Sequence, residues 1–266
     1  TPAGWLKGAV STLLGFPVFN IPLWFLGCLV SVEVLHRLTA RLTATATGLW
    51  LTALACYVGG YWLNREVFFI GRGWNVWFLN EAPVVLAFYL VGVWMRRRGV
   101  LMGPMRRGPL LALAAVLLAV VLCTFNLNMG PFRMFDAVVI VLGAHGHPLW
   151  FPFTALAGSL LLLVLAKAVG NSRASAWMGE NVLILFCLNG VFYHYFNGPY
   201  AAWATTQRLW TGPVQTTLAA AGFTALSLAA CVPVIWAIRR WLPQVAGRPT
   251  QSGPLLPALL RPEREA

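Results

Sequence analysis

Long apolar stretches recur along this chain and are separated by short polar links. A helix needs about 20 mostly apolar residues to cross the hydrocarbon core of a bilayer, and each stretch supplies close to that number. The stretches cover residues 19–38, 44–63, 76–95, 109–127, 147–169, 178–197 and 214–238. The pattern predicts an all-α polytopic membrane bundle with about seven transmembrane helices.

Lysine and arginine lie mostly on one side of the predicted membrane. If the first span runs inward, 14 of the 19 Lys and Arg residues fall at inner ends and links: Arg37, Arg41, Arg96, Arg97, Arg98, Arg106, Arg107, Lys167, Arg173, Arg239, Arg240, Arg248, Arg261 and Arg264. The outer side then holds Lys7, Arg65, Arg72, Arg133 and Arg208. Cations collect on the cytoplasmic side of membrane proteins, so the N-terminus is expected outside and the C-terminus in the cytoplasm.

Composition agrees with this class and argues against others. The chain is 59% hydrophobic and only 10% charged, whereas soluble domains average about 25% charged residues. The net charge of +12 would suit nucleic acid only on a folded soluble domain with a basic face, so no nucleic-acid partner is expected. The five cysteines all fall inside predicted spans, at no metal-binding or redox spacing, which indicates buried apolar residues.

Two segments outside the spans need separate interpretation. Residues 126–148 contain the apolar run 137–142, which is too short to cross a bilayer; it is expected to be re-entrant, interfacial or a cap over a cavity. Residues 246–266, rich in Pro and Arg, are expected to form a disordered cytoplasmic tail. The folded membrane domain is therefore assigned to residues 1–245.

Acidic groups at membrane depth are costly and are candidates for function. Glu33 precedes Arg37 by one helical turn, so an ion pair at the helix end is the favoured interpretation. Glu81 lies about one turn inside the outer end of its span, and a functional role is weighed equally with a solvated helix end. Asp136 lies in the outer link and would approach the same side. Arg65, Arg72 and Arg133 are the available partners there.

Histidines and basic links add further candidates. His145 and His147 are two possible ligands, too few for a metal site, so no metal is expected. His194, with Asn189 five residues before it, suits either a buried hydrogen-bonded histidine or a functional group. The basic links Arg96, Arg97, Arg98, Arg106 and Arg107 could contact the phosphates of a nucleotide-like ligand, although orientation and anionic lipid explain them more simply.

Two segments resemble a known family. Ile21-Pro22-Leu23-Trp24-Phe25-Leu26 resembles the PLWFL stretch of the membrane acyltransferase-3 family, which includes sugar O-acetylases. Residues 177–189, WMGENVLILFCLN, resemble that family's G-x-N-S-L stretch at the start of a late span, with Val182, Phe186 and Asn189 in place of the usual Ser, Tyr and His. The matched residues are Pro22, Trp24, Gly179 and Asn181, which look like packing and pocket-shaping positions. Residues 132–152 look most like the xanthan-type mannose O-acetyltransferases.

The resemblance implies a chemistry. Family members move acetyl from cytoplasmic acetyl-CoA, a co-substrate rather than a bound cofactor, to a hydroxyl of a glycan or lipid-linked oligosaccharide at the outer face of the bacterial inner membrane. They have about ten spans, and their Arg and His motif belongs to the first. A chain that starts outside at Thr1 is expected to lack three spans and that motif, so its catalytic residues are unknown and it should be inactive alone.

Two other classes remain open at this point. A flippase of lipid-linked glycan would also place polar groups in an outer cavity, but it should show broken helices at matching positions of two halves, which the sequence lacks. A seven-helix retinal protein needs a lysine in mid-span. Lys7 and Lys167 are the only lysines and neither lies there.

Overall fold

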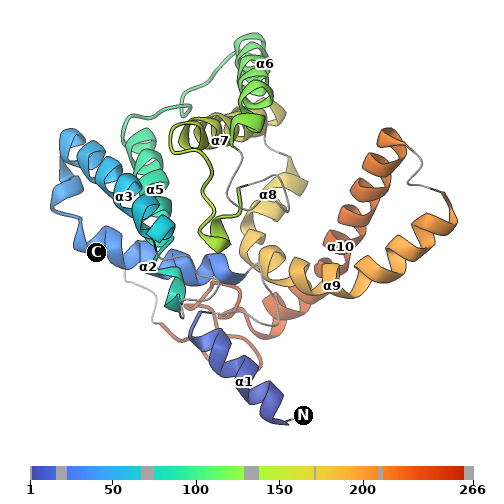
Figure 1. The fold of residues 1–266 in the computed structure, drawn as a ribbon. Helices are drawn as coiled ribbons and strands as arrows, with labels where there is room; N and C mark the ends of the chain where they lie inside the picture. The colour runs from blue at the N-terminus through green and yellow to red at the C-terminus, as the bar shows by residue number, and fades with distance from the viewer. Residues whose placement is uncertain are drawn as a thin grey trace. The chain divides into compact units, whose positions relative to one another are not determined.

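The computed structural model describes residues 2–15, 23–66, 75–128, 138–170, 172–208 and 212–260. It is helical and divides into two compact units (Figure 1). Unit 1 comprises Thr1–Pro17 and Trp24–Asn171, and unit 2 comprises Val18–Leu23 and Ser172–Ala266. Each unit is considered by itself.

Unit 1 is built mainly from consecutive helices that pack in pairs. Its α-helices are α1 (Pro2–Leu13), α2 (Trp24–Leu38), α3 (Ala46–Glu66), α5 (Ala82–Arg97), α6 (Arg107–Thr124) and α7 (Trp150–Val169). Short 3₁₀ turns join them: η2 (Leu42–Ala44), η3 (Val76–Phe78), η4 (Phe125–Asn128) and η6 (Ile140–Leu142). The closest pairs are α3 with α5 and α6 with α7, and α2 also packs on α5.

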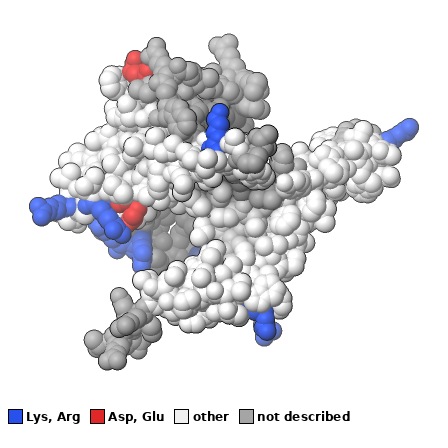
Figure 2. All heavy atoms as spheres, turned by 90° about the horizontal axis from the view of Figure 1, so that it is seen from below, with Lys and Arg blue, Asp and Glu red and all other residues white. Residues whose placement is uncertain are grey.

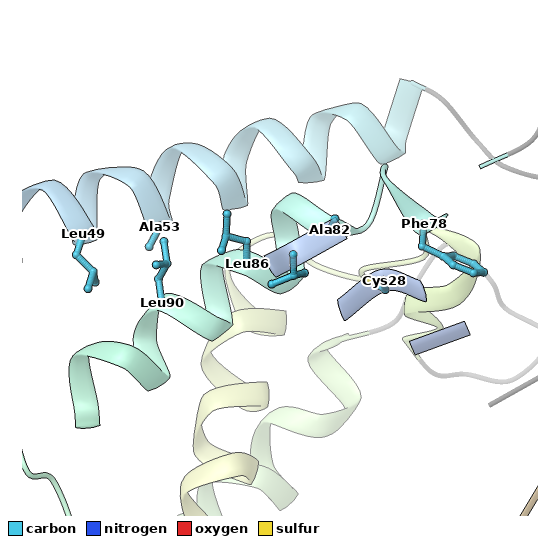
Figure 3. Packing of buried hydrophobic residues seen from close by; sticks show 8 residues of the cluster. Cys28, Leu49, Ala53, Phe78, Ala82, Leu86 and Leu90 are labelled. Carbon is cyan, nitrogen blue, oxygen red and sulfur yellow. The ribbon is translucent and has the colours of Figure 1, made fainter. Parts of the chain in front are cut away.

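The main core of unit 1 lies where α2, α3 and α5 meet. Figure 3 shows Leu49 and Ala53 of α3 directed at Leu86 and Leu90 of α5. Further along, a Cβ at Gly60 would lie 2.8 Å from Cγ2 of Val84. The glycine therefore allows the two helix backbones to approach closely, as small residues do between membrane helices.

The α6–α7 pair is held by apolar contacts and by one buried polar bridge. The Thr154 hydroxyl donates to the Thr124 hydroxyl at 2.8 Å, while Leu110, Ala114 and Val164 pack nearby. On α6, five other large apolar side chains are exposed: Leu111, Leu113, Val116, Leu118 and Leu122. An exposed apolar surface of this extent on a helix is suited to lipid rather than water.

Unit 2 contains α8 (Arg173–Glu180), α9 (Val182–Thr206) and α10 (Pro213–Trp241). Helices α9 and α10 pack together around Ile184, Leu185, Cys231 and Ile235. Ser172 caps the start of α8 by accepting a hydrogen bond from the backbone N–H of Ser175, as expected at a helix N-terminus.

Helices coincide with every predicted span. In the described part of the chain, four are long and apolar enough to cross a membrane: Val76–Arg97, Arg107–Asn128, Trp150–Val169 and Pro213–Trp241. The other predicted spans fall on α2, α3 and α9, so the count of seven stays a prediction. An all-α membrane protein is confirmed, and the surface drawn in Figure 2 is accordingly mostly uncharged.

Parts of the two segments outside the predicted spans, residues 126–148 and 246–266, have local structure of their own. Within 126–148, the residues from 138 form a compact turn closed by an antiparallel bridge between Val139 and Ala144. Toward the C-terminus, Nε2 of Gln244 donates to the carbonyls of Gln251, Leu256 and Pro257. The sequence predicts a disordered tail from residue 246. In the structure, backbone hydrogen bonds are present in this segment as far as residue 260.

Candidate functional site

Glu81 is the most deeply buried acidic side chain among the described residues. It stands immediately before α5 and is 0% exposed. Asn75 donates a hydrogen bond from Nδ2 to Oε2 of Glu81, whereas Oε1 is buried and has no hydrogen-bond partner. An unpaired buried carboxyl oxygen carries a free-energy cost, so Oε1 is a position where a hydrogen-bond donor of a ligand would be stabilised.

Two buried asparagines hold the backbone around Glu81. Oδ1 of Asn75 accepts from the backbone N–H of Asn80 at 3.1 Å. Asn64, at the end of α3, donates from Nδ2 to the carbonyls of Gly60 at 2.8 Å and Asn80 at 2.6 Å. These bonds fix the carboxyl group against α3. The two asparagines are neutral, so the hydropathy pattern of the sequence does not indicate this role.

The turn before Glu81 has a strained backbone. Trp77 and Phe78 both have φ of +53°, a region that bulky residues rarely adopt. The Ser31 hydroxyl of α2 donates to the Trp77 carbonyl at 2.8 Å, and the Trp77 N–H donates to the Leu14 carbonyl at 3.2 Å. Contacts from two other parts of the unit thus maintain the conformation, a condition under which strain persists at functional sites.

The compact turn at 138–148 lies against the same end of α3. Tyr57 and Tyr61 donate from their hydroxyls to the carbonyls of Pro148 and Gly146, each at 2.7 Å. Tyr57, Tyr61 and Asn64 are spaced by four and three residues and therefore share one face of the helix. That face positions both the turn and the residues around Glu81.

His145 is buried within this turn. It is 2% exposed and lies between the rings of Tyr61 and Phe151, with centroid distances of 6.4 and 5.9 Å. Neither ring nitrogen has a hydrogen-bond partner. Burial lowers the pKa of His145 to about 4, so the side chain is neutral at pH 7 and offers one donor and one acceptor to a ligand.

Asn128 contributes a further unpaired group beside this turn. Its Oδ1 is buried without a partner, and a Cβ at Gly146 would lie 2.9 Å from its backbone carbonyl oxygen. Gly146 has φ of +71°, so this close approach requires glycine. No role for Asn128 is predicted from the sequence, because its burial depends on the fold of the link.

The opposite end of α5 is basic. Sixteen residues separate Glu81 from Arg97, which at about 1.5 Å per helical residue is roughly 24 Å. Nη1 of Arg97 donates to the carbonyl of Thr43 at 2.7 Å, and Lys167 donates to the carbonyls of Leu101 and Gly103. Arg96, Arg98, Arg106 and Arg107 also belong to this end, which is nearly a bilayer thickness from Glu81.

The structure brings together some of the predicted candidates. Glu81 and His145 both lie at the Asn64 end of α3, while Asp136, Arg72 and Arg133 lie outside the described residues, as do the side chains of His194 and Asn189. Arg65 is exposed and forms no ion pair with Glu81, whose described partner is Asn75. The ion pair between Glu33 and Arg37 is confirmed, with Oε1 and Nε 2.9 Å apart.

The residues singled out by family resemblance have different environments. Asn181 is 2% exposed and lies at the break between α8 and α9. Its Nδ2 donates to the Trp177 carbonyl at 2.7 Å and its Oδ1 accepts from Arg239 at 3.2 Å. Trp24 packs on Phe78, Gly179 is exposed, and Pro22 lies outside the described residues.

A helical membrane domain with unpaired buried polar groups at one end suits an enzyme that handles a polar substrate at a membrane face. A family model described as an acyltransferase domain matches residues 1–236. The chain therefore belongs to the acyltransferase-3 family and is a membrane acyltransferase. Comparisons with curated proteins and with solved structures give no match.

Proposed function

We propose that this protein is an O-acetyltransferase of the bacterial inner membrane. It moves acetyl from cytoplasmic acetyl-CoA to a sugar hydroxyl of an exopolysaccharide or its lipid-linked precursor on the outer face. The observation that carries the proposal is two buried side chains with unpaired polar atoms, Oε1 of Glu81 and the ring nitrogens of His145, at one end of unit 1 of a membrane acyltransferase.

The polar groups suit the acceptor side of this reaction. Acyl transfer to an alcohol requires a base that removes the hydroxyl proton as the oxygen attacks the acyl carbon. A pKa of about 4 makes His145 a weak base, and its unprotonated nitrogen can accept a hydrogen bond from the attacking hydroxyl. Oε1 of Glu81 and Oδ1 of Asn128 can accept hydrogen bonds from neighbouring sugar hydroxyls, which orients the acceptor.

The distribution of charge supports an arrangement in which the donor and the acceptor bind on opposite sides of the membrane. Orientation by the positive-inside bias places the basic end of α5 in the cytoplasm, and Glu81 about 24 Å away on the outer side. The donor would then meet the protein at the basic side and the glycan would meet it at the Glu81 side. In the reaction the acetyl C–S bond of acetyl-CoA breaks and an ester C–O bond forms on the sugar, and CoA leaves as the thiol with the proton that the hydroxyl loses.

The test is acetylation of the polymer in a strain from which the gene has been deleted. The purified extracellular polysaccharide should lose its O-acetyl signals in the ¹H NMR spectrum, and a plasmid copy should restore them. Accumulation of unexported, still acetylated polymer in the deletion strain would overturn the proposal and indicate a flippase. In vitro, liposomes that contain the full-length gene product should transfer label from [¹⁴C]acetyl-CoA to the lipid-linked oligosaccharide.

A further inference from the structure

Unit 2 contains an open pocket of about 570 Å³ beside the last turns of α10. Its volume lies in the range of small-molecule sites, about 300–1,000 Å³. It is lined by Trp177 of α8 and by Val232, Ile235, Trp236, Arg239 and Arg240 of α10. The walls therefore combine two guanidinium groups with two indole rings and an aliphatic floor.

The first arginine is held in a fixed orientation. Nη1 of Arg239 donates to Oδ1 of Asn181 at 3.2 Å, and Nη2 lies 3.4 Å from Oε2 of Glu180. The same carboxylate oxygen lies 3.7 Å from Arg248. Glu180 is thus shared between two arginines, and the group retains an excess of positive charge.

The second arginine is available to a ligand. Within the described part of the chain, Arg240 has no hydrogen bond or ion pair; its guanidinium carbon lies 5.8 Å from the ring centroid of Trp236. Such stacking orients the planar group. Its N–H donors have no partner among the described residues, and a guanidinium group suits phosphate oxygens.

The aromatic walls narrow the class of ligand. Inorganic phosphate would fill only a small part of the pocket and would leave Trp177 and Val232 without contacts. A nucleotide presents phosphates to the arginines and a flat base to the indole rings, an arrangement in which base stacking and phosphate contacts act together. Trp236 is 61% exposed, so stacking on it would remove apolar surface from water.

We propose that this pocket binds the phosphates and the base of the nucleotide-bearing acyl donor. The inference rests on the proposed function, because it assigns the donor's position to the predicted cytoplasmic end of α10. It also moves the phosphate contacts away from Arg96, Arg97, Arg98, Arg106 and Arg107, which lie in the other unit.

The test measures binding of adenosine 3′,5′-bisphosphate and CoA by calorimetry to the purified full chain in nanodiscs of uncharged lipid. Arg240→Gln should weaken binding of both ligands at least about tenfold, because a charge-assisted hydrogen bond is lost. Arg248→Gln is the matched control, since it also removes one charge near Glu180 but does not line the pocket; its affinity should stay within twofold. Trp236→Leu should weaken CoA binding without altering charge.

Two results would overturn the inference. One is unchanged nucleotide affinity in Arg240→Gln whose melting temperature equals that of the wild type. The other is Arg240-dependent binding of phosphatidylglycerol vesicles with no binding of either nucleotide, which identifies a lipid headgroup site. Acetyl transfer measured in parallel separates the two proposals. Normal transfer with an unchanged donor KM in Arg240→Gln would refute only the assignment of the pocket. Arg240-dependent CoA binding in a protein without transferase activity would refute only the proposed function.

Discussion

Asn181 accepts a hydrogen bond from Arg239 across 58 residues of sequence. The bond joins the break between α8 and α9 to the last turns of α10. Asn181→Ala removes this acceptor and leaves the partly buried guanidinium group with one partner fewer, so the variant should lose about 1–3 kcal/mol of stability. Thermal melting in mild detergent checks this.

The neighbouring motif position provides the control. Gly179 has open space around the position of a Cβ and an ordinary helical backbone. Gly179→Ala should therefore melt within a degree or two of the wild type. Equal destabilisation by both substitutions would show that the motif acts through something other than the Asn181–Arg239 bond.

Glu81→Gln should lower acetylation of the polysaccharide without lowering the amount of protein in the membrane. The amide keeps an oxygen for Asn75 to donate to, but it replaces the unpaired Oε1 with a nitrogen that cannot accept a hydrogen bond. Loss of one hydrogen bond to the acceptor should reduce kcat/KM for the glycan about tenfold. Glu33→Gln, which alters an exposed ion pair, should acetylate normally. Normal activity of Glu81→Gln would move the acceptor site to His194 and Asn189.

Tyr61→Phe should loosen the turn that carries His145. The hydroxyl bond to the Gly146 carbonyl contributes about 1 kcal/mol, and its loss should raise the KM for the glycan more than it lowers kcat. The variant Tyr89→Phe serves as the control, because the described contact of Tyr89 is the packing of its ring on His36. A variant Tyr61→Phe with wild-type kinetics would show that the turn needs no tether.

Lowering the pH should reduce the stability of the protein, in part because of the buried His145. Its pKa is about 4 in the folded protein, whereas an exposed histidine titrates near pH 6.5. The unfolded chain therefore takes up a proton that the folded chain does not, and this contribution, complete above about pH 6.5, is lost as the pH falls toward 4. Between pH 7 and pH 5 the loss should be about 2 kcal/mol.

Melting of His145→Gln against wild type at the two pH values isolates this contribution. The variant should lose less stability on acidification than the wild type. His147→Gln removes an exposed histidine and should keep the full wild-type pH dependence. An identical pH dependence in all three proteins would contradict the burial of His145.

Membrane orientation is checked by labelling single cysteines in a Cys-free background. Ile70→Cys should react with an impermeant maleimide added outside, and Met102→Cys should be protected until the membrane is opened. This expectation follows from the excess of cations in the links assigned to the inside. The opposite labelling pattern would invert the protein and place Glu81 in the cytoplasm.

Hydropathy was sufficient to predict the helices of the long spans but not α1 or α8, and rarity of charge was sufficient to single out Glu81. The break at Asn181 was not predicted, because the predicted span began at residue 178, inside α8 (Arg173–Glu180). Asn64, Asn75 and Asn128 were also missed as site residues. Neutral amides give no charge signal, and their importance arises from contacts made only after the links have folded.

The packing of consecutive helices has a consequence for biogenesis. The three largest interfaces among the described helices join α3 to α5, α6 to α7 and α9 to α10, so each of the three is made between neighbours in synthesis order. A hairpin can bury its interface as soon as its second helix leaves the ribosome, without waiting for distant sequence. The polar links that hold Glu81 and His145 are then the last parts to be organised, after the helices that support them are already inserted.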